Sequence, residues 1–309
     1  MGRARRGLLA LLAALGAAGW FVTAPAAEDP DFAAGHRPDV ENGARVFAAA
    51  GCRSCHQPPD APESENTAPP LLSGGQAFNS DFGTFYAPNI SSDPVAGLGG
   101  WSLPQFANAV TQGVSPEGQH YYPAFPYAAY QHMTEGDVAD LFAYLQTLPA
   151  ATAEAPAHAV PFPFNLRRGL GLWKLAFMPE DYAVTGDLAP EQARGRYLAE
   201  ALAHCGECHT PRNAAGGLEL QRWLAGAPNP DGKGRIPNIT PAELTWSQAD
   251  IVGYFTTGFT PGYDTAGAQM AEVVENLALL PPQDREALAA YLMVVPPVPD
   301  APAEAAPAE

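Results

Sequence analysis

Apolar residues recur every three to four positions through most of this chain, and few segments alternate strictly between apolar and polar residues. The first spacing is that of one face of an α-helix, whereas alternation would indicate strands. Helices are expected over 43–50 and 191–203, and again over 138–145 and 282–294, where apolar stripes end each half of the chain. The pattern therefore predicts a mainly α fold.

Polar residues mark where several of these helices should begin. A Ser or Thr is followed three positions later by a residue that can return its hydrogen bond in Ser102-x-x-Gln105, Thr134-x-x-Asp137 and Ser247-x-x-Asp250. In such a capping box the hydroxyl accepts from a free amide of the first turn, and the later side chain accepts from the cap amide. Helix starts are predicted at all three positions.

Short motifs occur twice, in the same order, in the two halves of the chain. The pairs are Pro88-Asn89-Ile90 with Pro237-Asn238-Ile239, Trp101-Ser102 with Trp246-Ser247, and Ala143-Tyr144-Leu145 with Ala290-Tyr291-Leu292. Because the offsets differ only by loop lengths, they indicate a tandem duplication of one unit. Two domains are predicted, over 28–150 and 186–295.

The segments outside these domains have distinct compositions. The linker over 151–185 is rich in proline and then in aromatic residues, which is more apolar surface than a flexible linker carries. It is expected to pack across the domain interface. The tail over 296–309 is dominated by Pro, Ala and acidic residues and is expected to be disordered.

Residues 1–27 have the features of an export segment. Arg3, Arg5 and Arg6 precede an apolar run over 8–22, and small residues suited to cleavage follow at 24–26. The run is near the shortest that spans a bilayer, so a cleaved signal and a retained anchor both stay open, with the anchor slightly favoured. A periplasmic location is predicted, with anchoring to the inner membrane through residues 8–22.

The net charge of the chain indicates which classes of partner it can bind. Lys and Arg number 16 against 33 Asp and Glu, which gives a formal net charge of −17. Nucleic acid is excluded as a default partner, because phosphate binding needs a basic surface. An acidic surface can steer a basic protein partner, although it also simply keeps an exported protein soluble.

All four cysteines fall in two copies of Cys-x-x-Cys-His, namely Cys52-Arg53-Ser54-Cys55-His56 and Cys205-Gly206-Glu207-Cys208-His209. This motif attaches a c-type haem: the two thiols form thioethers to the vinyl groups, and the histidine binds the iron. Two covalently bound haem c groups are predicted. Cys52, Cys55, Cys205 and Cys208 would attach them, and His56 and His209 would be the proximal iron ligands.

Other uses of four cysteines explain the pattern less well. The two pairs lie too far apart for a usual zinc ribbon, and the βαβ pattern of a thioredoxin-like site is missing around both. Structural disulfides would suit an exported protein. None of these alternatives accounts for a histidine at the same offset in both copies.

The sixth iron ligand separates an electron carrier from an enzyme, because a carrier closes both axial positions. Met133 lies just before the closing helix of the first half, and Met270 is expected in the loop before the closing helix of the second. We favour both as axial ligands, and Met293 as a packing residue. His132, which adjoins Met133, is the main rival, and the other histidines outside the motifs are His36, His120, His158 and His204.

Several longer motifs resemble a known family, the class I cytochrome c domains in tandem. More narrowly, the chain resembles the multihaem cytochrome c subunits of periplasmic, membrane-bound dehydrogenases acting on alcohols and sugar acids, some of which carry a third haem domain. The resemblance implies that Met133 and Met270 are axial ligands. It rests on the segments 85–90, 121–127, 162–167 and 208–213.

This resemblance implies a dihaem electron-transfer protein rather than an enzyme. It would take single electrons from a dehydrogenase or quinol-oxidising partner and pass them towards a terminal oxidase or another cytochrome. The alternative is a dihaem redox enzyme of the peroxidase or thiosulfate-oxidising type, which would need one displaceable axial ligand.

Overall fold

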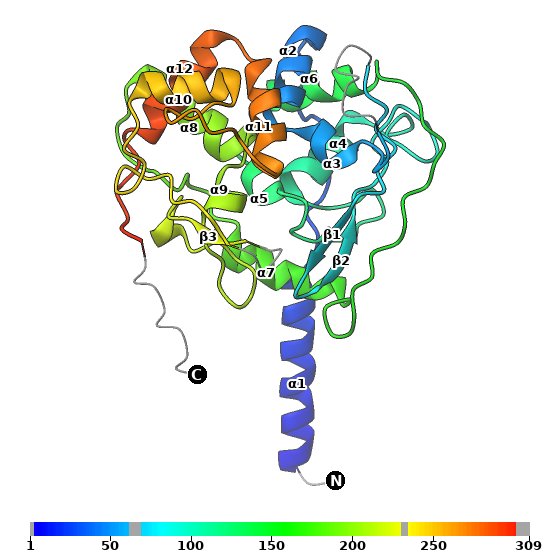
Figure 1. Ribbon diagram of the computed structural model, residues 1–309. Helices are drawn as coiled ribbons and strands as arrows, with labels where there is room; N and C mark the ends of the chain where they lie inside the picture. The colour runs from blue at the N-terminus through cyan, green and yellow to red at the C-terminus, as the bar shows by residue number, and fades with distance from the viewer. Residues whose placement is uncertain (1–2, 62–68, 230–233, 301–309) are drawn as a thin grey trace.

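A computed structural model describes residues 3–61, 69–229 and 234–300 (Figure 1). Helices dominate: α1 (Arg3–Val22), α2 (Val40–Ala49), α3 (Cys52–His56), α4 (Leu103–Gln112), α5 (Tyr127–Tyr130), α6 (Glu135–Leu145), α7 (Leu170–Phe177), α8 (Pro190–Arg196), α9 (Gly206–His209), α10 (Gln248–Thr257), α11 (Gln269–Ala278) and α12 (Pro282–Leu292). Short 3₁₀ turns lie at η1 (Arg167–Gly169) and η3 (Leu220–Arg222), and η2 (Tyr197–Leu202) is a π-helix. The expectation of a mainly α fold is confirmed.

Two small hairpins were not predicted. Strand β1 (Ala77–Ser80) pairs antiparallel with β2 (Gly83–Tyr86), and β3 (Ala227–Pro228) with β4 (Arg235–Ile236). Strands this short carry too few residues to show an alternating pattern. Each hairpin follows a Cys-x-x-Cys-His motif within its half of the chain.

In each half the first long helix crosses the closing helix at a glycine. A Cβ on Gly43 of α2 would lie 2.0 Å from the Asp140 carbonyl oxygen of α6, and one on Gly195 of α8 would lie 1.9 Å from that of Ala287 in α12. Only glycine allows backbones to approach this closely. The packing of α2 on α6 in the first half thus corresponds to the packing of α8 on α12 in the second.

The expected helix starts are present. Ser102 and Ser247 each complete a capping box with the residue three positions on, and the Thr134 hydroxyl accepts from the amide of Asp137. The helix expected over 191–203 is a regular α-helix only to Arg196, and then widens into the π-helix η2. A wider turn of this kind is often found beside functional sites, and here it leads directly to Cys205.

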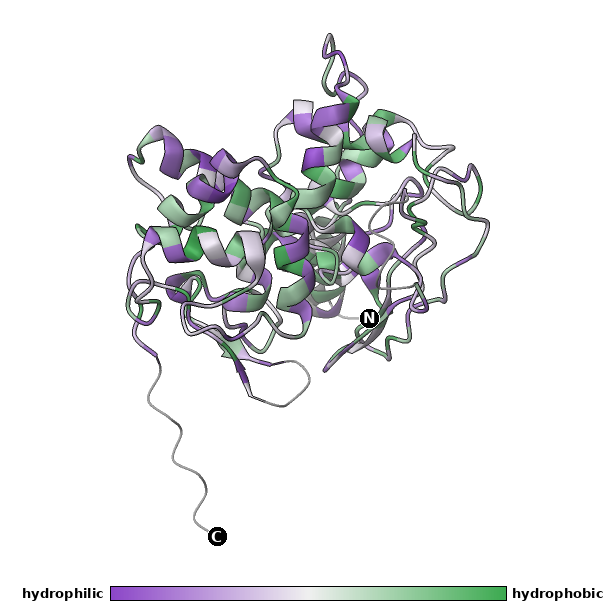
Figure 2. Cartoon of the chain, turned by 45° about the horizontal axis from the view of Figure 1, so that its top comes forward, coloured by the Kyte–Doolittle hydropathy of each residue, from purple (hydrophilic) through white to green (hydrophobic). Residues whose placement is uncertain are grey.

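One apolar core runs through both halves. It includes Val46, Val138 and Leu141 from the first half, and Leu198 and Leu288 from the second. Figure 2 shows the apolar faces of the helices turned towards the middle of the body. Cys52 and Cys205 of the two motifs both pack against this one core.

The segment between the two halves contacts both of them. In α7 the Lys174 ammonium donates to the Gly113 carbonyl, at 2.7 Å, and the Trp173 indole donates to that of Ala215, at 3.0 Å. Just before it, the Arg167 guanidinium donates to the carbonyl of His120. The segment that contains α7 is therefore hydrogen-bonded to both halves of the chain.

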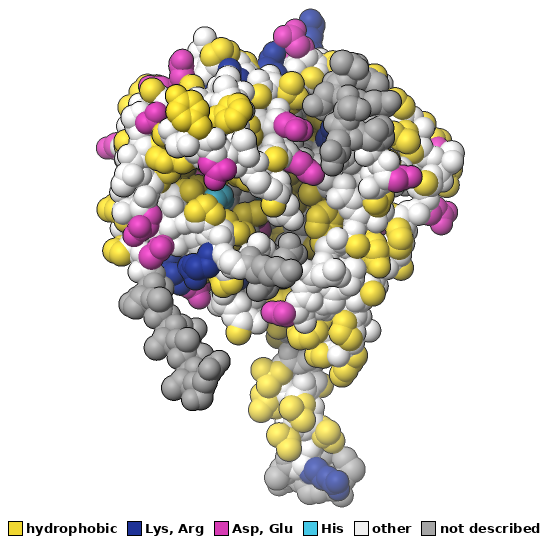
Figure 3. All heavy atoms as spheres, in the orientation of Figure 1, with side chains coloured by type: hydrophobic (Ala, Val, Ile, Leu, Met, Phe, Trp, Pro, Cys, Tyr) yellow, Lys and Arg dark blue, Asp and Glu magenta, His cyan; other side chains and the backbone are white. Residues whose placement is uncertain are grey.

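Helix α1 projects from the body, with the N-terminus at its far end (Figure 1), and apolar side chains lie along it in Figure 3. Within residues 3–61, 69–229 and 234–300, no helix has both the length and the apolar character needed to cross a membrane. Of the tail expected over 296–309, residues 301–309 lie outside the described residues.

Candidate haem sites

Both Cys-x-x-Cys-His motifs form a single helical turn. The first occupies α3, and the second begins at Cys205 and continues through α9. Cys55 and Cys208 are exposed, Cys52 and Cys205 are half-buried, and none of the four forms a disulfide. Each pair of thiols is thus carried by one short helical turn, with the histidine directly after the second cysteine.

The thiols are not arranged as reactive thiolates. Burial raises the pKa of Cys52 and of Cys205 to about 12. A redox-active cysteine needs a readily formed thiolate. Among the described residues no group of three His, Cys, Asp or Glu side chains could hold a metal ion. Attachment to a haem through neutral thiols fits these surroundings better than a zinc or dithiol site.

The two motif histidines are held in the same way. The Nδ1 atom of His56 lies 2.8 Å from the Pro88 carbonyl oxygen, and that of His209 lies 2.8 Å from the Pro237 carbonyl oxygen. A carbonyl at this distance places the proton on Nδ1 and leaves the Nε2 lone pair for an iron. Burial also lowers the pKa of both histidines, which favours the neutral, ligating form.

The proline carbonyls were not recognised from the sequence as part of the sites. The signal that pointed to them was the repetition of Pro-Asn-Ile in both halves. The Asn89 side chain donates to the carbonyls of Ala151 and Ala153, at 2.6 and 2.8 Å, and accepts from the Ser91 amide. It thereby fixes the loop that carries the Pro88 carbonyl, and its burial at 6% exposure gives Asn89 a structural role.

Buried polar side chains position the second motif. The Trp223 indole donates to the Tyr291 hydroxyl at 3.0 Å, and this hydroxyl donates to Glu200 in η2 at 2.5 Å. Trp223 also packs on the motif itself, since a Cβ on Gly206 would lie 2.1 Å from its ring. The glycine inside the second motif is therefore required by its neighbour, whereas the first motif carries Arg53 there.

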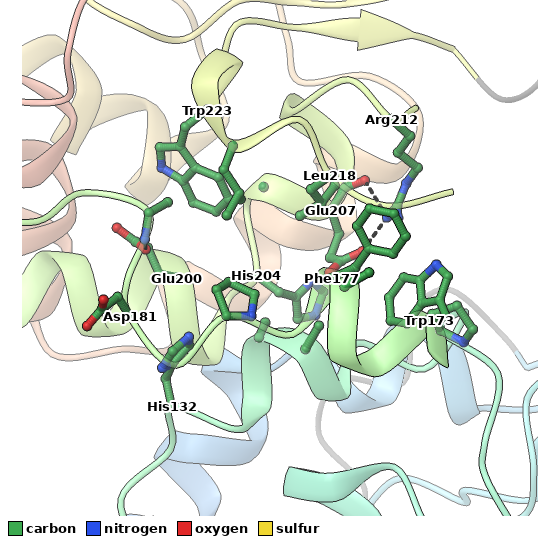
Figure 4. A pocket seen from close by; sticks show the side chains of 18 residues that line it. His132, Trp173, Phe177, Asp181, Glu200, His204, Glu207, Arg212, Leu218 and Trp223 are labelled. Carbon is green, nitrogen blue, oxygen red and sulfur yellow. Dashed lines mark hydrogen bonds and ion pairs between the residues drawn. The ribbon is translucent and has the colours of Figure 1, made fainter. Parts of the chain in front are cut away.

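A cavity of about 120 Å³ lies beside the second motif, between α5, α7 and α9. Figure 4 shows His132, Asp181 and Glu200 at one end of it and Trp173 and Arg212 at the other. Arg212 forms an ion pair with Glu207 of the motif. Residues of α7, the helix between the two halves, and of α9 both line this cavity.

The two candidate methionines lie in different settings. Met133 is 7% exposed in the turn between α5 and α6, as expected. Met270 was expected in a loop, and this was wrong: it is the second residue of α11, half-buried against the core. The segment forms a helix because its residues favour one and because Val274 and Leu277 give it a buried face.

The rivals to these methionines are engaged elsewhere or exposed. The His132 ring stacks on the Tyr182 ring, with centroids 4.6 Å apart. Met293 directly follows the last residue of α12 and is 44% exposed.

Two one-turn helices, each presenting two thiols and a carbonyl-oriented histidine, define a c-type cytochrome. The sequence profile of the cytochrome c family matches residues 40–149. A diheme cytochrome c-type protein of Cereibacter sphaeroides is 53% identical over 288 residues, which cover 93% of this chain and 96% of that protein. The chain belongs to the cytochrome c family.

Other relatives are subunits of larger assemblies. The fructose dehydrogenase cytochrome subunit of Gluconobacter japonicus is 38% identical over 87% of this chain and 55% of its own length. The gluconate 2-dehydrogenase cytochrome c subunit of Pantoea cypripedii is 31% identical over 82% of this chain and 58% of its own. The chain thus spans little more than half of these two. The expectation of an electron-transfer cytochrome, rather than a catalytic subunit, is confirmed.

Proposed function

We propose that this chain is an exported dihaem cytochrome c that passes single electrons from a dehydrogenase partner towards an oxidase or another cytochrome. The observation that carries the proposal is the duplicated site: both motif histidines meet a proline carbonyl at 2.8 Å. A site kept in both halves down to its supporting hydrogen bond favours one haem in each half.

The residues that would hold the haems follow from the two motifs. Cys52 and Cys55 would attach one haem, and the equivalent pair, Cys205 and Cys208, the other. His56 and His209 would bind the irons from one side. A bound haem supplies a reversible one-electron change at its iron, and the protein sets the potential through the axial ligands and the surroundings.

Methionine would close the opposite side of each iron. We propose Met133 for the first haem and Met270 for the second. The buried turn that holds Met133 and the half-buried first turn of α11 support these assignments. Methionine opposite histidine tends to raise a haem potential, which suits the later part of an electron-transfer chain.

A dehydrogenase is the donor that the relatives' names favour, since two of them are cytochrome subunits of such assemblies. The net charge of −17 supports a partner with a basic docking surface. Acidic side chains recur across the face seen in Figure 3. The three arginines and the apolar run at the N-terminus support export to the periplasm.

The methionine assignments are tested by near-infrared absorption, because oxidised haem with a sulfur ligand has a weak charge-transfer band there. We expect Met133→Ala and Met270→Ala each to remove about half of the band of the wild type, as one of two haems loses its sulfur ligand. Met293→Ala is the matched control and should leave the band unchanged, because Met293 is exposed. A wild type without the band would refute both assignments.

The partner is tested by purification from membranes of the native organism. A dehydrogenase subunit that co-purifies with the chain, and that reduces its haems when given substrate, is the expected result. Reduction of a purified chain by quinol alone, with no such subunit present, would contradict a dehydrogenase donor.

A further inference from the structure

His204, which directly precedes Cys205, has a backbone conformation that favours glycine. Its φ is +39°, in the left-handed region. The equivalent residue of the first half, just before Cys52, is Gly51, and its φ is +60°. Few residues other than glycine adopt this conformation, although histidine is among the more frequent of them. Such a residue is held in place by the structure around it.

The His204 side chain reaches into the other half of the molecule. Its Nε2 atom lies 3.3 Å from the Ala50 carbonyl oxygen at the end of α2. The Tyr130 hydroxyl donates to the same oxygen at 3.2 Å, and the two rings meet edge to face with centroids 5.6 Å apart. The imidazole is therefore fixed on two sides by residues of the first half.

The contact links the two haem-attachment turns through covalent bonds and a single hydrogen bond. Ala50 is two residues before Cys52, and His204 is one residue before Cys205. The path between the two thioether positions therefore follows the backbone from Cys52 to the Ala50 carbonyl, crosses one hydrogen bond, and returns through the His204 side chain and backbone to Cys205. A second bond holds the same surfaces together, from the Asn276 amide of α11 to the Ser54 hydroxyl of α3, at 2.9 Å.

We propose that the His204 imidazole couples the two haems for electron transfer across this contact. With one haem held by His56 and the other by His209, a single electron would pass from the reduced group to the oxidised one, and no proton or bond would change. Electrons tunnel better through bonded and hydrogen-bonded atoms than through a gap or solvent. The inference rests on the proposed function, since it needs a haem in each half.

The test replaces His204 with the residue that the first half already uses. His204→Gly removes the imidazole and suits the backbone conformation, so the chain should fold. His204→Asn is a second variant, because asparagine tolerates this conformation and is too short to reach Ala50. Tyr197→Phe is the matched control: it removes bonds to Asp137 and Thr134 across the same interface, away from the motifs.

Electron exchange is measured in half-reduced, full-length protein by two-dimensional exchange NMR of the haem methyl signals, at several dilutions to isolate transfer within a molecule. We expect a several-fold slower exchange in both His204 variants, an unchanged rate in Tyr197→Phe, and unchanged midpoint potentials in all three. An unchanged rate in the His204 variants, or an equal fall in Tyr197→Phe, would overturn the role of His204 while leaving the proposed function intact. A wild type with one haem would overturn both.

Discussion

The glycine at the first helix crossing provides a direct test of the packing described above. Gly43→Ala places a methyl group where the backbone of α6 already lies. The new Cβ would stand 2.0 Å from the Asp140 carbonyl oxygen, and 2.8 Å from the Cβ of Tyr144, whereas ordinary contacts begin at 3.4 Å. Helices α2 and α6 would have to separate by more than 1 Å along this line.

Two opposing effects determine how much Gly43→Ala changes the free energy of unfolding. Alanine favours a helix over glycine by about 0.5–1 kcal/mol, which would stabilise the variant. Overpacking of a tight core costs about 1–3 kcal/mol and sometimes more. The neighbour here is backbone, which cannot rotate away as a side chain can. The cost of the clash should therefore exceed the gain in helix propensity. We expect a net loss of roughly 1–2 kcal/mol or more of unfolding free energy.

Urea unfolding of the haem-loaded protein, followed by far-ultraviolet circular dichroism, measures this loss. Gly195→Ala should behave in the same way, because its Cβ would lie 1.9 Å from the Ala287 carbonyl oxygen. Gly253→Ala in α10 is the matched control: apart from its own helix backbone, nothing lies within 4 Å of the new Cβ, and the change should be stabilising. If Gly43→Ala proved as stable as Gly253→Ala, the close crossing of α2 and α6 would be refuted.

Two further predictions concern buried polar groups. Asn89→Ala removes the donor to the Ala153 carbonyl and the acceptor of the Ser91 amide, and it leaves the Ala151 carbonyl with only the Ser91 hydroxyl. It should lower the unfolding free energy by about 1–3 kcal/mol, measured by urea unfolding, whereas the exposed Asn79→Ala should change it little. For Asp140, burial raises the pKa, but hydrogen bonds from the Asp39 amide and His36 outweigh it and leave the pKa below its usual value. A carboxyl with a lowered folded pKa stabilises the protein above its unfolded pKa and loses that contribution as the pH falls, so the wild type should weaken below about pH 4 more steeply than Asp140→Asn. Parallel pH curves for these two proteins would contradict this role of Asp140.

Much of the local structure could be predicted because it is coded by neighbouring residues. The capping boxes at Ser102 and Ser247 depend on side chains three positions apart, and both are formed. The haem motifs likewise place two thiols and a histidine within one helical turn. Features of this kind need no knowledge of what packs around them.

The rest depends on contacts between distant segments. Helix α11 gains its buried face only by packing in the second half and against α2. The residues around Met270 therefore do not by themselves predict a helix there. The switch to a π-helix before Cys205 accompanies buried bonds of Glu200 to Tyr291 and to the amides of Ala183 and Val184. Likewise, nothing in the local sequence indicated that His204 would meet Ala50 from the other half.

We propose above all that each half of this chain carries a covalently bound haem. The most direct measurement is the intact mass of the denatured protein, for the wild type and for Cys52→Ala/Cys55→Ala and Cys205→Ala/Cys208→Ala. We expect a mass greater than that of the polypeptide by two haem groups in the wild type, and by one in each double variant. A wild type that carries one haem or none after denaturation would contradict it.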